Sequence, residues 1–560
     1  MNTLRLIEAR TPQRHVGTLE LDDATEPSRF LDDPMLPCFT VRRGRRAKGI
    51  AVKKIYRGVL AAGLVLSGVS VAQPAFAARN VLLIILDDVG AEEIRSYARD
   101  LYSATKSSNG SASIKDTNAN GYPDGLEDAD HDGNPDGSIG TPTIDTLASA
   151  GVRFTQVWSN PVCSPTRAGI YTGRYGIHHG IGAPLGGSTM IWTLPSDVTT
   201  LAEQLTAQHS TYSKGLFGKW HLGEMTGTLP TDRGWDYFAG VTAGQVTSYY
   251  GWDKVTVDEY GVRTDTHETE YVTTTITNDA IAWISRQTGS WWATVAMNAA
   301  HTPYEAPPSF CLSGKISGSD NTALFHKTIE CADYHIASLL ASIDSATLAN
   351  TTIVFVGDNG TEGGVTQVYD SSRAKGAVYQ GGVHVPLIVA DGAALAGRSG
   401  SGTGTITSVG RTVSSITSTV DIFSTLAQIM GVSVSSTDAV SLVTYLQSTS
   451  ATAARTYSYT DAFKYTASQV TALQNSLADP ANLTTANVAT LTKTNIQGAI
   501  RSSQYKLIYT NGSYKLYDLL NDPFEQSNKW CASQTYKTQA QTLITALRAI
   551  DTTFPTKRCQ

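Results

Sequence analysis

A continuous apolar run at residues 80–86, NVLLIIL, constrains the fold of this chain more than any other feature of its sequence. A strand with one face in solvent would alternate apolar and polar side chains, so this run predicts a strand that is covered on both faces. A second run at residues 352–356, TIVFV, has the same character. Helical patterns lie between and after the two runs, at residues 145–150, 201–208, 328–343 and 421–430. Buried strands that alternate with helices predict an α/β domain with a largely parallel sheet.

The last part of the chain has a different pattern. Residues 391–419 are rich in Gly, Ser and Thr and are predicted to form a loop. Farther along, the segments 505–509 and 514–517 flank a Thr-Asn-Gly-Ser turn and predict a β-hairpin, and a helix is expected near residues 535–550. This pattern predicts a small α+β domain built on an antiparallel sheet. The expected domains are residues 78–450 and residues 451–560.

The N-terminal residues indicate export. Residues 52–77 begin with basic side chains, continue with GVLAAGLVLSGVSVA and end in Ala75-Phe76-Ala77, which is the order of a secretory signal peptide. The apolar part is too short for a membrane span, although an uncleaved anchor helix is the alternative. Residues 1–51 form a leader, explained by a start codon assigned too far upstream or by a twin-arginine signal at Arg42 and Arg43. We predict a secreted or periplasmic protein without membrane attachment after cleavage.

The net charge bears on possible partners, and the predicted export puts the cysteines in an oxidising compartment. The net charge of −6 over 560 residues does not suggest a nucleic-acid partner. The five cysteines after the leader are Cys163, Cys311, Cys331, Cys531 and Cys559. An odd count in an exported protein indicates one thiol that is not part of a disulfide. Proximity in sequence suggests the pairs 311–331 and 531–559, among three connectivities that four cysteines allow, and leaves Cys163 over.

Oxygen-bearing side chains follow both buried runs. Asp87 and Asp88 come directly after the first, and Asp358 and Asn359 follow the second after one glycine. Each pair alone would be unremarkable, since acidic residues at strand ends usually lie in solvated turns. Open α/β sheets place ligands at the carboxyl ends of their strands, and Ca²⁺ or Mg²⁺ needs several oxygens from separate rigid elements. Together, the four residues predict a metal site.

The segment Cys163-Ser164-Pro165-Thr166-Arg167, followed by AGIYTGR, resembles the signature of the type I sulfatases. That signature is C-x-P-x-R before a short helix that ends in TGR, and its Cys is oxidised to Cα-formylglycine. The resemblance extends from residue 80 to about residue 530. The other matching blocks, in the order of the family, are residues 80–90, 141–158, 218–223 (GKWHLG), 233–240, 301–307 (HTPYEAP), 357–360, 375–386 and 514–528. The chain is thereby identified as a member of the alkaline phosphatase-like superfamily, which implies a large mixed, mostly parallel sheet sandwiched by helices.

The resemblance also implies roles for individual residues. The metal, normally Ca²⁺, would be held by Asp87, Asp88, Asp358 and Asn359 together with the oxidised Cys163. The catalytic set would be Cys163, Arg167, Lys219, His221, His301 and Lys375. Within it, His221 is expected to be the base that helps to expel sulfate, and His301 the general acid. A formylglycine-generating enzyme is the implied partner during maturation. His178, His179 and His384 are left unassigned.

An aldehyde hydrate suits sulfate ester chemistry better than a hydroxyl side chain. One of its two hydroxyls can attack sulfur, and the other can then lose a proton so that the C–O bond breaks and sulfate leaves. A serine in the same place could attack but would be left sulfated. Cations and a divalent metal stabilise the negative charge that develops as the alcohol departs. The chain departs from the family block E-G-G-x-R-V-P by having Gln380 and His384, which puts the fine positioning of the site in doubt.

Residues 116–137 are an insertion relative to this family pattern. They contain two copies of D-x-[DN]-x-[DN]-G-x-P-D-G at a spacing of 12 residues. The expected ligands of one or more further Ca²⁺ ions are Asp116, Asn118, Asn120, Asp124, Asp128, Asp130, Asp132 and Asp136. Proline inside each copy and the lack of flanking amphipathic helices make the segment resemble thrombospondin type 3 repeats rather than an EF-hand. A merely acidic, solvated loop is the alternative.

Three functions are compatible with these patterns. The first is a sulfatase that hydrolyses a sulfate monoester of a small molecule or glycan to the alcohol and inorganic sulfate. The second is a phosphonate or phosphate ester hydrolase of the same superfamily. The third is a catalytically silent, secreted calcium-binding protein, which is weakened because every catalytic position holds a competent residue. The residues GKWHLG and HTPYEAP favour sulfur over phosphorus.

Overall fold

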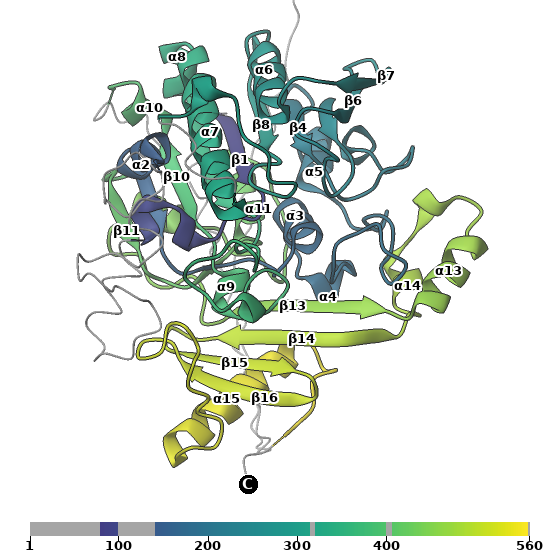
Figure 1. Cartoon of the computed structure of the whole chain (residues 1–560), viewed down its shortest axis with the longest axis vertical. Coiled ribbons are helices and arrows are strands. Elements are labelled where there is room, and N and C mark those ends of the chain that lie inside the picture. The colour runs from purple at the N-terminus through teal and green to yellow at the C-terminus, as the bar shows by residue number, and fades with distance from the viewer. Residues whose placement is uncertain (1–78, 99–139, 314–319, 399–405, 558–560) are drawn as a thin grey trace, which may run out of the picture. The chain divides into compact units, whose positions relative to one another are not determined.

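A ten-stranded mixed sheet runs through the larger part of the described chain (Figure 1). The computed structural model describes residues 79–98, 140–313, 320–398 and 406–557, all within the unit Ala72–Gln560. The predicted leader, signal peptide and calcium insertion, and Cys559, lie outside the described residues. In order across the sheet, the strands are β11 (Arg411–Val413), β2 (Gly151–Phe154), β10 (Leu387–Asp391), β9 (Thr351–Gly357), β1 (Asn80–Leu86), β8 (Trp291–Ala296), β4 (Ser213–Lys219), β5 (Tyr237–Val241), β6 (Trp252–Val257) and β7 (Arg263–Glu268).

The centre of this sheet is parallel and its flanks are mainly antiparallel. Within the run β9, β1, β8, β4 and β5, every pair of adjacent strands is parallel. Strand β10 pairs antiparallel with both β9 and β2, and β6 and β7 continue the opposite edge as an antiparallel ribbon. The predicted large, mixed and mostly parallel sheet is confirmed.

Strand β1 shows why the apolar run at residues 80–86 forms the middle of the sheet. Alternate side chains of a strand point to opposite faces. Val81, Leu83 and Ile85 belong to one hydrophobic core, and Leu82, Ile84 and Leu86 belong to another. All six are fully buried. The uniform hydrophobicity of the run therefore reflects a core on each face, as predicted.

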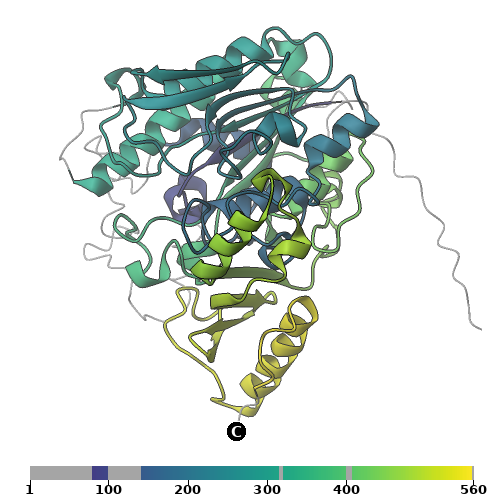
Figure 2. The same ribbon diagram turned by 90° about the vertical axis from the view of Figure 1, so that its right-hand side faces the viewer.

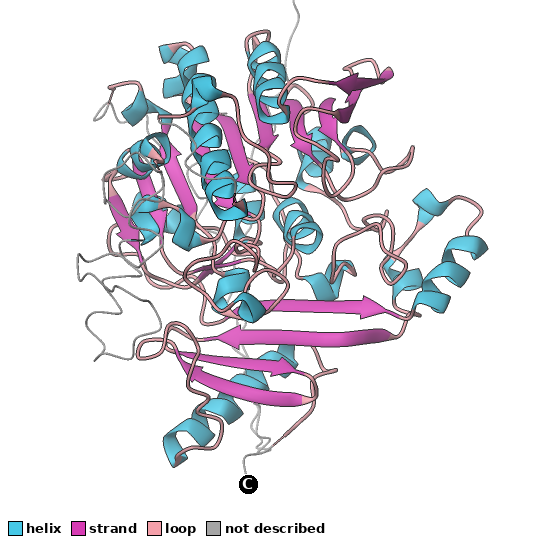
Figure 3. Cartoon of the chain, viewed as in Figure 1, coloured by secondary structure: helices cyan, strands magenta, loops and turns pink. Residues whose placement is uncertain are grey.

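Helices cover both faces of the sheet (Figures 1 and 3). Residues of α5 (Leu201–Gln208) and α11 (Asp421–Ile429) share a core with Val81, and α3 (Cys163–Thr172) packs beside α11. Residues of α2 (Pro142–Ser149), α6 (Val272–Ile284) and α7 (Asn321–Ser342) share the core that contains Leu82. The shorter elements are β3 (Val157–Trp158), β12 (Thr417–Ser418), α4 (Gly176–His179), α8 (Ser345–Ala349), α9 (Gln380–Val383), α10 (Gly392–Leu395), α12 (Val443–Gln447), α13 (Ala467–Ser476) and α14 (Thr485–Val488).

Three predictions of secondary structure need correction. The helix expected at residues 145–150 is α2, which begins three residues earlier, at Pro142. Helix α7 begins at Asn321 and not at residue 328, because the side chain of Asp320 accepts a hydrogen bond from Ala323 N and caps the helix earlier. The predicted loop at residues 391–419 contains α10, β11 and β12. Strand β11 is only three residues long and is held at the sheet edge by pairing with β2. So short a strand leaves no periodic pattern in the sequence.

A second, four-stranded antiparallel sheet follows, as predicted, and is drawn in yellow-green in Figures 1 and 2. Its strands, in order, are β13 (Ser458–Tyr465), β14 (Lys493–Arg501), β15 (Tyr505–Thr510) and β16 (Ser513–Asp518), and α15 (Gln534–Ile550) packs against β14 and β15. The predicted hairpin is β15 and β16, with positive φ values of 49° at Asn511 and 73° at Gly512. Asn-Gly favours this turn conformation. The domain boundary at residue 450 stays a prediction.

The cysteines follow the predicted pattern as far as the described residues extend. Cys311 and Cys331 form a disulfide, and Cys163 is a buried free thiol. Cys531 is also disulfide-bonded, and its predicted pairing with Cys559 stays a prediction. Among the described helices, none has the length and apolar character needed to cross a bilayer.

Candidate active site

Four oxygen-bearing side chains meet at the ends of two neighbouring strands. Asp87 and Asp88 follow β1, Asp358 and Asn359 follow β9, and the two strands pair in parallel up to Leu86 and Gly357. We call these four residues the metal cluster. Oxygens of its three carboxylates lie within 4.8 Å of one another, and all four residues are buried. Asp88 has a φ of 64°, which is unusual for a residue with a side chain and often marks a functional position.

Each carboxylate of the metal cluster has a cationic partner. Arg167 Nη2 lies 2.8 Å from Asp358 Oδ2, and Lys219 Nζ lies 2.5 Å from Asp87 Oδ2. Lys375 Nζ lies 2.5 Å from Asp88 Oδ2. Arg167 also donates from Nη1 to the carbonyl oxygen of Lys219 at 2.9 Å, which ties α3 to the end of β4.

The surroundings of the metal cluster shift the pKa values of Asp88 and Asp358 in opposite directions. Burial by itself raises the pKa of Asp88, but nearby positive charge, that of Lys375 above all, outweighs burial and lowers it. Burial and the neighbouring Asp87 raise the pKa of Asp358 to about 7, against the opposing effect of Arg167. Acids this close and this deeply buried resist full ionisation unless more positive charge is added.

The donor set fits a hard divalent cation. Asn359 Nδ2 donates to Asp88 Oδ1 at 2.8 Å and to Gly360 O at 3.0 Å. Its Oδ1 is buried without a hydrogen-bond partner, and so is Asp87 Oδ1. Buried acceptors without partners are costly, and a cation would satisfy both. Cys163 is not one of the three residues that group around such an ion, so its predicted role as a ligand stays a proposal.

Cys163 is the first residue of α3 and lies beside His221. Its Sγ is 3.2 Å from His221 Nδ1, and His221 Nε2 is 3.3 Å from Leu185 O. A carbonyl oxygen accepts only, so Nε2 carries the proton and Nδ1 presents a lone pair to residue 163. Burial, and then Lys219 and Arg167, lower the pKa of His221 well below its usual value. Its ring is therefore neutral at neutral pH.

Gly244 helps to position this imidazole, and no sequence motif pointed to it. A Cβ on Gly244 would lie 2.5 Å from His221 Nε2. His221 itself has a φ of 55°, so its backbone is also held in an uncommon conformation. Only glycine allows the loop after β5 to approach the ring so closely.

His301 lies beside Asp88. Its Nε2 is 3.8 Å from Asp88 Oδ2, and its Nδ1 is 2.8 Å from Thr302 O. Burial lowers the pKa of His301 to about 4, although Asp88 opposes this. Nearby, the side-chain amide of Asn298 is buried and neither of its polar atoms has a partner. This residue was also missed, because a single Asn outside the recognised blocks carries no signal.

The unassigned histidines have other surroundings. His178 pairs with Asp438 at 2.6 Å, and buried His179 contacts Pro165 O at 3.2 Å, which supports α3. Gln380 accepts a hydrogen bond from Trp158 Nε1 at 2.8 Å, and His384 Nε2 lies 2.9 Å from Thr155 O.

The structure brings together all ten residues predicted for the metal and for catalysis, whereas the predicted ligands in the insertion lie outside the described residues.

Known proteins resemble this chain in both sequence and structure. A family model described as Sulfatase matches residues 79–432. Arylsulfatase H of Canis lupus familiaris is 26% identical over 389 residues, which are 52% of this chain and 65% of that protein. The chain therefore spans less than two thirds of this curated relative.

Solved structures share the fold. A protein in complex with its substrate, D-glucosamine-2-N,6-O-disulfate, superimposes with a TM-score of 0.56 at 17% identity, over 85% of this chain and 98% of that one. The phosphonate monoester hydrolase of Agrobacterium radiobacter gives a TM-score of 0.54 at 20% identity, over 85% and 96% of the two chains. At these identities the likeness shows the fold alone.

Proposed function

The chain belongs to the sulfatase family, and on that premise we propose that it hydrolyses a sulfate monoester to an alcohol and inorganic sulfate. The observation that carries this proposal is the position of Cys163, 3.2 Å from His221 and beside the metal cluster. Burial raises the pKa of the Cys163 thiol, so the unmodified side chain would be a poor nucleophile. A Cα-formylglycine derived from it would suit this place better.

The chain would hold two further groups. A divalent metal, proposed to be Ca²⁺, would be held by Asp87, Asp88, Asp358 and Asn359 and would stabilise negative charge as a Lewis acid. A formylglycine hydrate at position 163 would supply the hydroxyl that attacks sulfur. An all-oxygen donor set favours Ca²⁺ or Mg²⁺ over zinc or copper.

His221 is proposed to accept a proton from residue 163. Its Nδ1 lone pair faces that residue, and its Nε2 proton is held by Leu185 O. The lowered pKa keeps the ring neutral and ready to accept a proton at neutral pH. Gly244 keeps the ring in this orientation because its missing side chain leaves the necessary space.

His301 and Lys375 are proposed to act on the ester oxygens. Both lie next to Asp88: His301 Nε2 is 3.8 Å and Lys375 Nζ is 2.5 Å from Asp88 Oδ2. Because Nδ1 of His301 donates to Thr302 O, its Nε2 faces Asp88 and would have to gain a proton, making the ring an imidazolium, before it donates that proton to the departing alcohol. Lys375 would bind the sulfate group as a point charge. Arg167 and Lys219, both fully buried, would orient the carboxylates of the metal cluster.

Charge balance supports an anionic substrate. Three carboxylates and three cationic side chains in and around the metal cluster compensate one another. A bound divalent cation would make the site positive before the ester arrives. A negatively charged sulfate group would then be attracted to a preorganised, water-poor site.

Maturation and export belong to the same proposal. Cys163 is only 2% exposed in the folded chain, so a formylglycine-generating enzyme would need to act before folding is complete. The signal at residues 52–77 would direct the chain to the periplasm or outside the cell. In the millimolar calcium of an extracellular medium, the insertion at residues 116–137 would bind structural Ca²⁺.

The substrate is proposed to be a sulfated small molecule or glycan. One structural relative has a disulfated glucosamine as its substrate, while another is a phosphonate monoester hydrolase. Phosphonate or phosphate ester hydrolysis is therefore the second candidate. A screen of p-nitrophenyl sulfate, p-nitrophenyl phosphate and a phenyl phosphonate separates the two, and preference for phosphorus would contradict the first.

The decisive test is mass spectrometry of the tryptic peptide that contains Cys163, from protein made with and without a formylglycine-generating enzyme. We expect the mass of formylglycine only with that enzyme, together with activity. Cys163→Ala should abolish turnover and leave the circular dichroism spectrum unchanged. Active protein with an unmodified thiol would refute the mechanism.

A further inference from the structure

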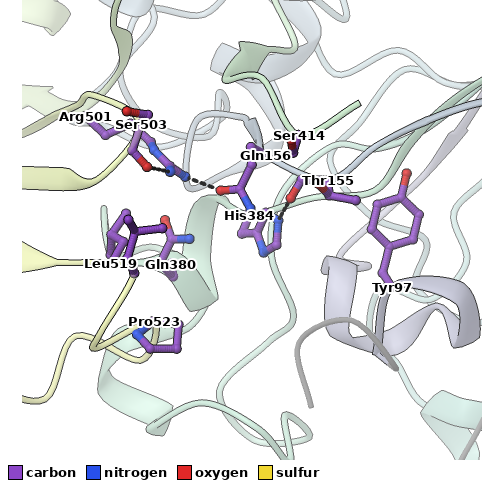
Figure 4. Close-up of a pocket in the computed structure, with 11 residues that line it drawn as sticks. Tyr97, Thr155, Gln156, Gln380, His384, Ser414, Arg501, Ser503, Leu519 and Pro523 are labelled. Atoms are coloured by element: carbon purple, nitrogen blue, oxygen red, sulfur yellow. Dashed lines mark hydrogen bonds between the residues drawn. The ribbon is translucent and has the colours of Figure 1, made fainter. Parts of the chain in front are cut away.

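A cavity of about 380 Å³ is lined by none of the residues assigned above to the metal or to catalysis (Figure 4). Its walls come from Tyr97, from the segments after β2 and β11, from helix α9 and its C-terminal end, and from the segments at the ends of β14 and β16. The residues that the following argument uses are Gln156, Gln380, His384, Arg501 and Ser503. We call it the Arg501 pocket. Its volume is in the range of small-molecule sites.

Among the described residues that line the pocket, Arg501 is the one charged side chain at neutral pH. None of these described lining residues is Asp, Glu or Lys. Burial lowers the pKa of His384 to about 4, so that its imidazole is neutral. Burial also lowers the pKa of Arg501 to about 10, which still leaves the guanidinium charged. The other polar groups that line the pocket are amides and hydroxyls.

The guanidinium of Arg501 has only neutral hydrogen-bond acceptors. Nε donates to Ser502 O at 3.1 Å, Nη1 to Gln156 Oε1 at 2.8 Å and Nη2 to Ser503 O at 3.3 Å. Figure 4 shows its bonds to Gln156 and Ser503. No carboxylate among the described residues forms an ion pair with it, although the side chain is only 2% exposed. A guanidinium has five N–H groups, so two remain without an acceptor among the described residues.

Glu525, the carboxylate whose charge acts on Arg501, is already engaged by another cation. Glu525 Oε1 lies 2.7 Å from Lys506 Nζ, and Glu525 Oε2 accepts a hydrogen bond from Gln380 N. Lys506 and Arg501 lie 4.6 Å and 5.6 Å from the centre of the Trp158 ring. Two buried cations thus share one carboxylate. A buried charge without a counter-charge is costly, and an anion in the pocket would reduce this cost.

Gln380 and His384 add neutral polar groups to the pocket wall. The family block that this segment resembles has Glu and Arg at these positions, whereas Gln380 leaves the wall without a carboxylate near Arg501. His384 Nε2 is bonded to Thr155 O, and its Nδ1 is buried without a partner. That nitrogen can accept a hydrogen bond from a ligand hydroxyl.

We propose that the Arg501 pocket binds a small organic anion, of about the size of a monosaccharide, that carries a sulfate or carboxylate group. Arg501 binds the anionic group, Gln156 and Ser503 hold the guanidinium in place, and a hydroxyl of the ligand reaches His384. An inorganic oxyanion alone fills only part of a cavity of about 380 Å³. The site is separate from the metal cluster and does not depend on turnover.

Isothermal titration calorimetry on the full chain with Cys163→Ala, which prevents turnover, tests this proposal. The probes are glucuronate, glucose 6-sulfate, inorganic sulfate and glucose. We expect glucuronate and glucose 6-sulfate to bind more tightly than inorganic sulfate, and glucose not to bind. Binding of glucose as tight as that of glucuronate would overturn the proposal, because the anionic group would then contribute nothing.

Variants locate the binding. Arg501→Gln should weaken glucuronate binding about tenfold or more, the size expected when a hydrogen bond to a charged group is lost. Gln380→Glu keeps Arg501 and supplies an internal carboxylate, so it should weaken binding similarly even if Arg501→Gln folds poorly. Arg263→Gln, at an exposed arginine paired with Asp265, is the matched control and should bind normally. Wild-type affinity in both Arg501→Gln and Gln380→Glu would overturn the proposal. Hydrolysis of p-nitrophenyl sulfate by the same variants with Cys163 intact tests the proposed function independently.

Discussion

In the metal cluster three buried carboxylates face three cationic side chains, whereas beside the Arg501 pocket two buried cations share the single carboxylate of Glu525. The first region also has unpartnered oxygens on Asp87 and Asn359, and the second has a guanidinium with only neutral partners. Both regions are removed from water, so neither can rely on solvent to stabilise its charges.

The difference between the two regions indicates what each can bind. Surplus acceptor oxygens suit a cation, and a divalent ion would turn a balanced group of charges into one that attracts an anionic ester. Surplus positive charge suits an anion directly. We therefore assign a cation to the metal cluster and an anion to the Arg501 pocket. Variants in the metal cluster should respond to an added divalent cation, and variants in the Arg501 pocket to an added organic anion.

The largest expected effect comes from removing a carboxylate in the metal cluster. Asp87→Asn leaves Lys219, which is fully buried, without its ion-pair partner. Removing one member of a buried pair costs about 3–5 kcal/mol. Urea denaturation in the presence of EDTA measures the change in unfolding free energy without the contribution of the metal, and hydrolysis of p-nitrophenyl sulfate in calcium should be lost.

The exposed carboxylate Asp265, paired with Arg263 at 2.7 Å, provides the control for that experiment. Asp265→Asn should change the unfolding free energy by less than about 1 kcal/mol, as is usual for a surface pair. If Asp87→Asn were no more destabilising than Asp265→Asn, the charges of the metal cluster would not be as interdependent as we infer.

The second prediction concerns Lys506 and pH. Burial lowers the pKa of Lys506 to about 8 from an ordinary 10.5, despite Glu525. Between these two pKa values the unfolded chain binds more protons than the folded one, so the free energy of unfolding rises with pH. Below pH 8 the destabilisation caused by the buried, charged lysine is fully present. This rise, on the order of 3 kcal/mol, should be missing in Lys506→Met.

Urea denaturation at pH 7.5 and pH 10 measures this difference. Lys464→Met removes an exposed lysine and should keep the pH dependence of the wild-type protein. Identical pH dependence in the wild-type protein and in Lys506→Met would show that the second region does not carry excess positive charge.

Gly244→Ala tests whether the rate of hydrolysis depends on the position of the His221 ring. The new Cβ would lie 2.5 Å from the ring of His221, which must then move. A displacement of about 1 Å in a catalytic group can cost about 10²-fold in rate, so kcat should fall by about that factor while KM changes little. Gly187→Ala, where no atom lies within 4 Å, is the control. Unchanged kcat in Gly244→Ala would remove His221 from the proposed mechanism.

The sequence predicted the centre of the fold because β1 and β9 are buried on both faces and are therefore uniformly apolar. It also predicted the residues of the metal cluster, since Asp87 and Asp88 adjoin in sequence and directly follow a recognisable strand. Edge strands such as β11 and β12 were missed, because their stability depends on pairing with distant strands and not on a local pattern.

The Arg501 pocket could not be predicted for a different reason. Its residues come from six separate segments, including those of Gln156, Gln380 and Arg501, and none of them lies in a motif that names a ligand. The departures at Gln380 and His384 were visible in the sequence, but their meaning depends on the guanidinium that the fold places nearby. Gly244 was missed similarly, because its importance lies in the space that it leaves for His221.

The insertion at residues 116–137 extends the comparison to a third oxygen-rich region, although it lies outside the described residues. It contains seven Asp or Glu residues and no Lys or Arg, so the segment itself supplies no positive charge. Bound calcium would offset that negative charge. Replacing Asp128, Asp130 and Asp132 with Ala should lower the melting temperature by about 2–4 °C in calcium and not in EGTA. Asp253→Ala, at an exposed carboxylate, should have no such effect, and an equal change with and without calcium would make the insertion an ordinary acidic loop.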